Sequence, residues 1–590
     1  MRLSFLRIIR LRYFIFPLMK RLFLVLLSCT TICHAQTLIK NVNVVDVEQR
    51  KILQQQSVVM LEGRITSIDK NKQFKLPPGT EVIDGTGQYL VPGFVDAHVH
   101  FFQSGGIYTR PDVIDLRQFK PYAGEVQWTH QNMDNLLRRY LRTGITTVID
   151  VGSTLHFLQQ RDSFLQKPYA PAIYMAGPLL TTWGPQAYKN LGADEPFLEM
   201  KTEADARSFV QKQLPYKPDF IKIWYIVRGS NIESGARQYL PLVKAAIDEA
   251  HKNNLKVAVH ATERITAQLA VEAGANFLVH GIDNEVVDQA FLDLLKKKNV
   301  VVSPTLVVAG NYQKALSQQY RASATDRALA HPVPLGSLDD LAHLPDTALT
   351  QRYKQLFTQH RQRMATEDSI LRLNLRRMLQ AGISIATGTD AGNIGTQHSS
   401  SYFDELSAMQ QAGFDLWSLL QAATINGAKA IGKEKEWGSL KVGKTANMVL
   451  LQANPLDSLT NWQKAAWIIN KGVAIQPDSL QINSPESLAQ EQLNAYNNHD
   501  LEAFLKPYAE DVEVYTFPDQ LRFKGKEEMR KRYQFITRTP QLYCDLQNRI
   551  VQGNTVIDHE KVYGFGSQPV YVIAVYKMEN GKIKKVYFIQ

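Results

Sequence analysis

Residues 89–101, YLVPGFVDAHVHF, combine an apolar run with two histidines near its end. The apolar part predicts a buried β-strand, in which His98 and His100 stand two positions apart. Because alternate side chains of a strand point to the same face, both imidazoles are expected on one side of this strand. A buried imidazole without a partner costs free energy, so each of them needs a partner.

Seven further apolar runs follow, separated by sequence that is largely helical in pattern. One separating segment repeats its apolar residues with the spacing of a helix face, at Val287, Ala290, Phe291 and Leu294. Eight alternations of strand and helix predict an α/β fold, a (β/α)8 TIM barrel over residues 93–434. A polar, helical insertion at 311–372 is a candidate lid, because it follows the seventh run on the rim where such barrels keep their active sites. The seven runs lie at 144–152, 171–180, 219–227, 255–261, 276–281, 299–308 and 382–392.

Strand patterns flank the predicted barrel on both sides. Residues 36–92 and 435–480 predict short strands that join into one composite, small β-sandwich. After a linker at 483–486, residues 484–590 predict a separate α+β domain. It opens with a helix and closes with a hairpin around Asn580-Gly581, which is a strong turn signal.

Composition fits several globular domains and excludes a disordered or fibrous protein, since 44% of the 590 residues are hydrophobic and 21% are charged. The net charge is +11, but residues 1–35 hold six basic and no acidic residues, and without them 61 basic residues face 56 acidic ones. So small a surplus, without basic runs, argues against a nucleic-acid partner. Cys29 and Cys33 lie in the same stretch, so Cys544 is left without a partner for a disulfide or a Cys-based metal site.

Residues 19–35, MKRLFLVLLSCTTICHA, have the layout of a secretory signal peptide, with cations before an apolar run and cleavage expected after Ala35. We therefore expect residues 1–35 to be removed and the protein to be periplasmic or secreted. Met19 is an alternative start, and a lipoprotein attached through Cys29 is an alternative form of the exported protein. No integral membrane span is expected, because two cations interrupt the apolar sequence.

Six polar residues lie in or at the end of the predicted strands. Parallel strands of a barrel bring their C-terminal ends together around one mouth, so these residues are expected to converge. Imidazole and carboxylate groups are ligands of zinc and similar ions. A single histidine at a strand end would be weak evidence, but the whole set predicts a metal centre: His98, His100, Lys222, His260, His280 and Asp390.

Lys222 is the unusual member of this set, because an ammonium ion beside two dications would be strongly repelled. The neutral amine is therefore favoured, and it can take up carbon dioxide to form a carbamate whose two oxygens can bridge two metal ions. We expect two divalent metal ions, with zinc as the expected element, and carbon dioxide as a carbamate on Lys222. An ordinary ion pair between Lys222 and a carboxylate is the alternative.

The strand runs closely resemble the amidohydrolase superfamily, in the branch of imidazolonepropionase-related proteins, metal-dependent prolidases and Xaa-Arg dipeptidases. The resemblance covers residues 37–480 and is carried by GFVDAHVHF at 93–101, DFIKIWY at 219–225, VHATE at 259–263, FLVHG at 277–281 and ATGTDAG at 386–392. It implies one metal ion on His98 and His100, a second on His260 and His280, a bridge through carboxylated Lys222, and Asp390 as ligand and catalytic proton shuttle. The sequence departs from many relatives at Ile149, where they carry Arg.

Three further residues are candidates for binding the substrate. Tyr225 and Arg228 lie just past Lys222 and could hold a substrate carboxylate at the mouth. His398 lies in the loop after the eighth run. Packing or solvent contact explains Tyr225 and Arg228 at least as well.

Residues 484–590 resemble a SnoaL-like domain, with the cone-shaped α+β fold of nuclear-transport-factor-like proteins. The match is carried by AYNNHDLEAFLKPYAEDVEVY at 495–515, GNTVIDHEKVYG at 553–564 and the final hairpin. Oligomerisation or the lining of a pocket is the expected role of this domain. A second catalytic site would draw on residues that ordinary strand polarity explains as well: His499, Asp558, His559 and Glu560.

These observations predict an exported, metal-dependent amidohydrolase that hydrolyses a C–N bond with metal-activated hydroxide. The expected substrate is a small molecule, namely a dipeptide, an N-acyl amino acid or a cyclic amide, and the protein could form a homo-oligomer. One alternative is a mononuclear-metal deaminase that uses Glu263 as proton donor, against which Lys222 argues. The alternative from another class is a non-catalytic exported protein that binds a small ligand, but such a protein needs no activated water.

Overall fold

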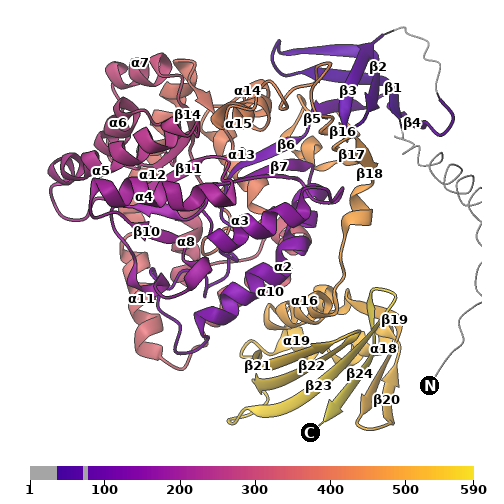
Figure 1. Ribbon diagram of the computed structural model, residues 1–590. Coiled ribbons are helices and arrows are strands. Elements are labelled where there is room, and N and C mark those ends of the chain that lie inside the picture. Colours follow the sequence, from indigo (N-terminus) through magenta and orange to yellow (C-terminus); the bar gives the residue numbers. More distant parts are fainter. Residues whose placement is uncertain (1–35, 71–76, 590) are drawn as a thin grey trace, which may run out of the picture.

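A computed structural model describes residues 36–70 and 77–589, and the expected signal peptide lies outside these residues. The chain forms a large α/β part with a small sheet at one end, and a C-terminal domain that packs beside them (Figure 1). Among the helices of the described residues, none is both long enough and apolar enough to cross a bilayer.

The centre of the α/β part consists of ten parallel strands, of which β10 alone lies wholly outside the eight predicted runs. They pair in two sheets, one in the order β6, β7, β8 and the other in the order β10, β9, β11, β12, β13, β14, β15. The first sheet contains β6 Phe94–Val99, β7 Ile145–Asp150 and β8 Ala172–Met175. The second contains β9 Leu179–Thr181, β10 Phe197–Glu199, β11 Ile221–Trp224, β12 Val257–His260, β13 Phe277–Val279, β14 Val301–Ser303 and β15 Ser384–Ile385.

The strand pairing alone does not close these two sheets into the predicted barrel. β15 has only two residues, so the irregular segment after it makes the contact with β6. There the amide of Ala97 donates to the carbonyl of Thr387 at 2.8 Å, and Val99 forms an isolated bridge with Ala391. Between β8 and β11, the amide of Asp219 donates to the carbonyl of Met175 at 2.9 Å.

Helices follow the strands and cover their outer side (Figure 1). They are α2 Tyr122–Arg142, α3 Leu155–Arg161, α4 Glu203–Gln213, α5 Ile232–Lys252, α6 Arg264–Ala273 and α7 Gln289–Lys297. The helix face predicted for α7 is confirmed at Val287, Phe291 and Leu294, which pack against the core, and is wrong at Ala290, which is exposed. The side chain of Asp288 accepts a hydrogen bond from the amide of Phe291 at 2.8 Å and so fixes where this helix begins.

The predicted insertion between β14 and β15 is helical in the structure. It contains α8 Val308–Leu316, α9 Ala324–Leu329, α10 Pro332–Asp340, α11 Thr347–Gln359 and α12 Arg361–Gln380. Its apolar residues share a core with those of the connection between β6 and α2. The insertion contributes Leu316, Leu335 and Leu341 to this core, and the connection contributes Ile107, Ile114 and Leu116. The insertion therefore packs against the loop that follows the strand of His98. Three helices complete this part: α13 Ser401–Gln411, α14 Leu416–Ala422 and α15 Ile425–Ala430.

The small sheet is composite, as its strands come from both ends of the α/β part. It contains β1 Thr37–Asp46, β2 Lys51–Leu61, β3 Arg64–Asp69, β4 Glu81–Asp84, β5 Tyr89–Pro92, β16 Met448–Leu451, β17 Ala465–Asn470 and β18 Val473–Ile475. The two groups join where β5 pairs with β16. Instead of the two facing sheets of a sandwich, all eight strands belong to one hydrogen-bonded sheet, in which register shifts bend β1 over an apolar core.

The C-terminal domain places helices against a six-stranded sheet in the order β20, β19, β24, β23, β22, β21 (Figure 1). The predicted final hairpin is confirmed, since β23 and β24 pair and the turn residues Asn580 and Gly581 have φ angles of 50° and 69°. The helices are α16 Pro485–Asn497, α17 Leu501–Leu505, α18 Lys526–Arg532 and α19 Phe535–Arg538. The strands are β19 Tyr508–Thr516, β20 Gln520–Lys524, β21 Tyr543–Gln552, β22 Thr555–Tyr563, β23 Val570–Glu579 and β24 Lys582–Ile589.

This domain docks on the insertion through α16 and α10. The amide nitrogen of the Asn494 side chain donates to the carbonyl of Pro332 at 2.8 Å. Nearby, the rings of His343 and Tyr543 stack with their centroids 3.4 Å apart. A cavity of about 680 Å³ lies between the two parts.

Candidate metal centre

The six predicted ligands lie at the C-terminal ends of the parallel strands or just beyond them. His98 is in β6 and His100 follows that strand, Lys222 is in β11, and His260 is the last residue of β12. His280 comes directly after β13, and Asp390 lies in the segment after β15. Residues that are up to about 290 positions apart in the chain therefore meet at one end of the sheets, as parallel strand ends do.

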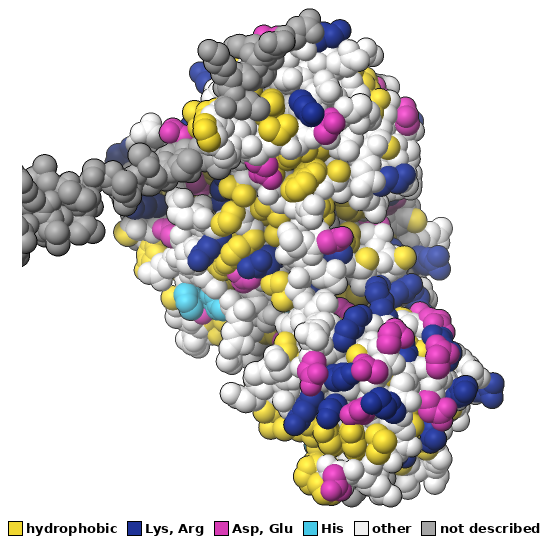
Figure 2. Space-filling model, turned by 90° about the vertical axis from the view of Figure 1, so that its right-hand side faces the viewer, with side chains coloured by type: hydrophobic (Ala, Val, Ile, Leu, Met, Phe, Trp, Pro, Cys, Tyr) yellow, Lys and Arg dark blue, Asp and Glu magenta, His cyan; other side chains and the backbone are white. Residues whose placement is uncertain are grey.

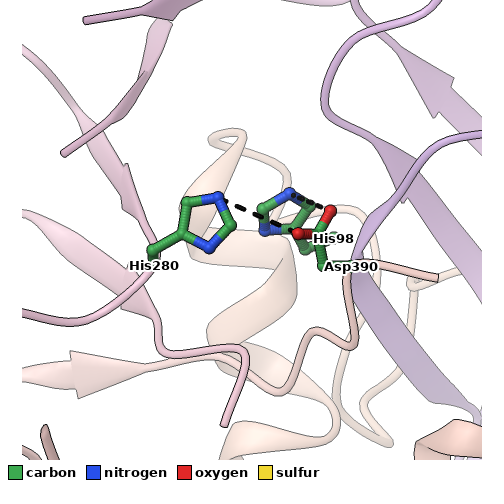
Figure 3. Close-up of side chains that lie close together, drawn as sticks. All are labelled: His98, His280 and Asp390. Atoms are coloured by element: carbon green, nitrogen blue, oxygen red, sulfur yellow. Dashed lines mark ion pairs between the residues drawn. The ribbon is translucent and has the colours of Figure 1, made fainter. Parts of the chain in front are cut away.

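Asp390 lies at the centre of this group. Its Oδ1 is 3.2 Å from Nε2 of His98 and 3.2 Å from Nε2 of His100. Its Oδ2 is 4.0 Å from Nε2 of His280, and Figure 3 shows His98 and His280 both directing a ring nitrogen toward the carboxylate. The ring of His260 is 4.3 Å from that of His280, measured between centroids, so all four imidazoles belong to one cluster.

The hydrogen bonds of these side chains suit a bound cation. Both ring nitrogens of His98 and Oδ1 of Asp390 are buried without a hydrogen-bond partner, which is costly unless another group satisfies them. His100 donates from Nδ1 to the carbonyl of Gly152 at 2.6 Å, which leaves the lone pair of its Nε2 free. Nδ1 of His280 is hydrogen-bonded to the hydroxyl of Thr305 at 2.7 Å, so its Nε2 is the nitrogen that faces Asp390. This is the pattern that orients metal-ligating histidines.

The backbone holds two of these residues in an uncommon conformation. His280 and Asp390 have φ angles of 74° and 60°, and Thr305, which contacts His280, has 50°. Each such non-glycine residue costs on the order of 1 kcal/mol or more, and such strain gathers at functional sites. Two backbone bonds compensate: the amide of Asp390 donates to the carbonyl of His98 at 2.7 Å, and that of His280 donates to Ser303 at 2.8 Å.

Burial favours the neutral form of three of the imidazoles and of the amine. Desolvation lowers the pKa of His98 to about 4 and holds those of His260 and His280 well below their usual range. It lowers the pKa of Lys222 to about 7, although Asp390 and Asp150 act in the opposite direction. The neutral forms of these side chains are the ones that can donate an electron pair to a metal ion or, for the amine, to carbon dioxide.

Two buried aspartates beside the cluster were not predicted from the sequence. Asp96 accepts hydrogen bonds from the amide and the hydroxyl of Thr389 at 3.1 and 2.8 Å, next to Asp390. Asp150 accepts from the amide of Phe101 at 3.1 Å, and burial raises the pKa of each aspartate to about 7. Asp96 precedes His98 by two positions in an apolar run, so the period of two could have revealed it.

The cluster opens to solvent on the side of His260 and His280, which are partly exposed, whereas His98, His100, Lys222 and Asp390 are buried. Aromatic rings stand beside this opening. The ring of Trp224 is 6.0 Å from that of His260, and Trp183 and Phe197 lie 5.7 and 4.9 Å from Trp224. The guanidinium of Arg228, one of the predicted substrate residues, lies 3.5 Å from the centroid of Trp183 and is thus at the outer edge of this wall.

The other two predicted substrate residues point elsewhere. Tyr225 is fully buried and its hydroxyl donates to the carbonyl of Ala236 in α5, so it belongs to the core outside the sheet. His398 is buried, with Nδ1 on the hydroxyl of Tyr140 at 2.9 Å and Nε2 on the carbonyl of Gln103 at 2.8 Å. Both ring nitrogens of His398 are thus used in structural hydrogen bonds, and neither residue is left to hold a substrate.

The polar residues singled out in the C-terminal domain do not form one site. Asp558 is buried in a two-pronged ion pair with Arg549, at 2.7 and 2.6 Å. Glu560 accepts from the hydroxyl of Tyr576 at 3.0 Å, while His559 is exposed on the opposite face of β22. His499 lies apart from them, with Nδ1 on the carbonyl of Ile536 at 3.0 Å.

Comparison with known proteins gives the same division of the chain. Residues 89–473 match the model of the amidohydrolase family, and residues 489–586 match that of the SnoaL-like domain. The chain is 20% identical over 422 residues to an imidazolonepropionase of Fusobacterium nucleatum, which covers 67% of this chain and 84% of that protein.

Other matches are shorter or more distant. A 5-methylthioadenosine/S-adenosylhomocysteine deaminase of Teredinibacter turnerae is 37% identical over 87 residues, which is 14% of this chain and a fifth of that protein. The chain thus spans a fifth or less of the length of several curated relatives. A crystal structure of a Xaa-Pro dipeptidase with methionine bound in its active site superposes with a TM-score of 0.56 at 21% identity, covering 75% of this chain and all of that one, which shows the fold. Members of the family that matches are typically metal-dependent. The chain belongs to the amidohydrolase family, with an α/β fold of the TIM-barrel type and a C-terminal SnoaL-like domain.

Proposed function

We propose that this protein is an enzyme that hydrolyses a C–N bond in an amide, a cyclic amide or a dipeptide. One observation carries the proposal: the unpartnered nitrogens of His98 and the free Oδ1 of Asp390 converge with the other imidazoles at the strand ends. We further propose that these side chains hold two zinc ions and that Lys222 carries a carbamate between them. The neutral state of the amine near pH 7 supports the carbamate.

Metal ions in such a site lower the pKa of water enough to supply hydroxide near neutral pH. Asp390 is the residue that we assign to proton transfer. Burial raises its pKa, but the nearby imidazoles of His98, His100 and His280 lower it, and the net pKa lies well below the usual range. Asp390 therefore starts ionised and can accept a proton on Oδ1, which no other donor occupies, and then deliver it to the departing amine.

The surroundings of the opening indicate the substrate class. Trp183, Phe197 and Trp224 offer flat apolar faces beside His260, so a substrate with an apolar or aromatic group next to the scissile bond fits best. Arg228, exposed above Trp183, stays our candidate for a substrate carboxylate. These features, together with the dipeptidase among the similar structures, make dipeptides and N-acyl amino acids the first compounds to test.

The test is hydrolysis of a panel of dipeptides, N-acyl amino acids and cyclic amides by the zinc-loaded protein. We expect at least one compound to be cleaved by the wild type and by a His360→Ala control, which removes an exposed histidine from the turn between α11 and α12. We expect no cleavage by the His98→Ala, His100→Ala double variant. Equal rates for all three proteins would refute the proposal.

Deamination is the second candidate, since deaminases are among the curated relatives. Glu263 directly precedes α6, and its Oε2 accepts a hydrogen bond from the hydroxyl of Thr266 at 3.0 Å. Ammonia release from aminopurines by a protein whose metal content is unchanged in Lys222→Met would favour the deaminase. Loss of one metal ion per chain in Lys222→Met would favour the binuclear hydrolase.

We also propose that the parallel strands of the two sheets close into a barrel, on the strength of the backbone bonds at the two seams. Cleavage after Ala35 and export to the periplasm or beyond stay proposals, with N-terminal sequencing of the secreted product as the test.

A homo-oligomer is proposed because exposed apolar residues gather in the C-terminal domain, where Figure 2 shows hydrophobic side chains along its lower edge. They include Ile550, Tyr563, Phe565, Tyr571 and Ile573. Light scattering after gel filtration gives the number of chains.

A further inference from the structure

We propose that His130, His156 and Asp194 form a second metal site, which binds a transition dication such as Zn²⁺ and ties three segments of the chain together. His130 lies in α2, His156 in α3, and Asp194 ends the 3-10 turn Gly192–Asp194. Their ligand atoms all lie within 4.8 Å of one another. None of these residues belongs to the metal centre described above, so the proposal does not depend on the proposed function.

The carboxylate of Asp194 stands between the two imidazoles. Its Oδ1 is 2.8 Å from Nε2 of His130, and its Oδ2 is 3.2 Å from Nδ1 of His156. The hydroxyl of Thr154 also donates to Oδ1, at 3.2 Å, and orients the carboxylate. Two imidazoles and one carboxylate make up a ligand set that zinc and similar ions prefer, with remaining positions left for water.

Gln160 fixes the protonation of the His130 ring. The Nε2 of Gln160 donates to the backbone carbonyl of His130 at 2.8 Å, so its Oε1 must be the atom that faces Nδ1 of His130, at 2.6 Å. An amide oxygen only accepts, and Nδ1 therefore carries a proton. In the neutral ring this leaves the lone pair of Nε2 directed at Asp194, which is the arrangement of a histidine whose far nitrogen is held for metal binding.

A cation is needed between Asp194 and the ring of His130. Without one, a neutral His130 would turn a lone pair toward a carboxylate oxygen at 2.8 Å. In the metal-free protein a proton on Nε2 of His130 meets this need, and a dication that displaces the proton would in addition bind His156. One dication bound by both nitrogens and the carboxylate satisfies all three groups at once.

The exposure of the cluster defines the kind of site. The side chains of His130 and Asp194 are 14% and 19% exposed, whereas that of His156 is 50% exposed. Solvent therefore reaches the ion past His156, and exchange with metal in the medium is expected. Because the ligands come from two helices and from the connection between β9 and β10, a bound ion would fasten that connection to the helical layer.

The test counts zinc ions in the full-length protein after dialysis against buffered Zn²⁺, by mass spectrometry of the digested samples. Two ligand variants, His156→Ala and Asp194→Asn, are compared with the wild type and with His360→Ala, which removes an exposed histidine elsewhere. We expect the wild type and the control to hold one more zinc ion per chain than either ligand variant. The zinc affinity of the site formed by His130, His156 and Asp194 should fall on the order of 100-fold in the two ligand variants.

Circular dichroism is used to check that each variant is folded. If His156→Ala does not fold, the zinc content of Asp194→Asn, which keeps the shape of the side chain, decides the test. Co²⁺ offers a second readout, because a bound ion with imidazole ligands gives a visible absorption band that should weaken in both variants. Equal zinc content in all four proteins would overturn the proposal and leave the cluster as a hydrogen-bonded imidazolium and carboxylate. An additional ion that persists in Asp194→Asn would overturn it as well.

Discussion

The pKa of Lys222 gives a prediction about carbamate formation in the metal-free protein. At a fixed, sub-saturating bicarbonate concentration, the amount of carbamate is proportional to the neutral amine. With a pKa of about 7 the neutral amine makes up roughly 9% of Lys222 at about pH 6 and roughly 90% at about pH 8. The signal should therefore rise about tenfold with pH, because loss of the proton creates the reactive form.

An ordinary lysine behaves differently over the same interval. With a pKa of 10.5 the neutral amine would increase about 100-fold between these pH values, and its amount near pH 7 would be about a thousandfold smaller than that of Lys222. The increase therefore separates a buried, desolvated lysine from an exposed one. The carbamate signal rises with pH in both cases, and only the steepness of the rise and the amount of carbamate near pH 7 differ.

The assay is ¹³C NMR of the metal-free protein in labelled bicarbonate. The spectrum of a Lys222→Met variant is subtracted to remove the carbamates of other lysines and of the N-terminus. Methionine matches the length of the lysine stem without an amine, so the buried site stays filled. Absence of a difference signal at about pH 8, or a 100-fold rise between the two pH values, would refute the reasoning.

Three further substitutions test the surroundings of the centre and the core. Thr305→Val removes the hydroxyl that holds Nδ1 of His280 at 2.7 Å and should weaken zinc binding on the order of 10- to 100-fold, as measured by competition with a chelating dye. Gly388→Ala would put a Cβ 2.6 Å from Cβ of His98, and the resulting displacement should lower kcat/KM on the order of 100-fold while circular dichroism stays unchanged. Trp462→Ala empties a fully buried position and should destabilise the α/β part by about 3–5 kcal/mol in urea denaturation, without altering the zinc content of the folded protein.

Much of the candidate metal centre could be predicted from the sequence, because its residues interrupt or end apolar strands. A histidine such as His260 at the end of a buried run signals its position directly, since parallel strands all end on one side. The features that escaped depend on partners far away in the chain. Tyr225 finds an acceptor in α5, and His398 finds the hydroxyl of Tyr140, which no local pattern reveals.

The fold shows the same limit. The apolar runs predicted all of the parallel strands except β10, but the closure between β15 and β6 depends on an irregular segment with isolated backbone bonds, and sequence periodicity does not describe such a segment. In α7 the periodicity found the buried Phe291 and misplaced only Ala290, which is exposed. The cluster of His130 and Asp194 gave no signal, since two helices and a turn bring these polar residues together only after folding.

The contact between α10 and α16 limits how this protein can be recombined with its relatives. A side chain at Gly336 would place its Cβ 2.8 Å from Cγ of Asn494, so the Asn494 side chain would have to leave its present position on the carbonyl of Pro332. Cutting the chain at the linker before α16 would uncover the surface of the insertion that Asn494 and Tyr543 occupy. A chimera that exchanges the SnoaL-like domain must therefore exchange α10 with it, and a shortened expression clone should end beyond the last strand rather than at the boundary between the two families.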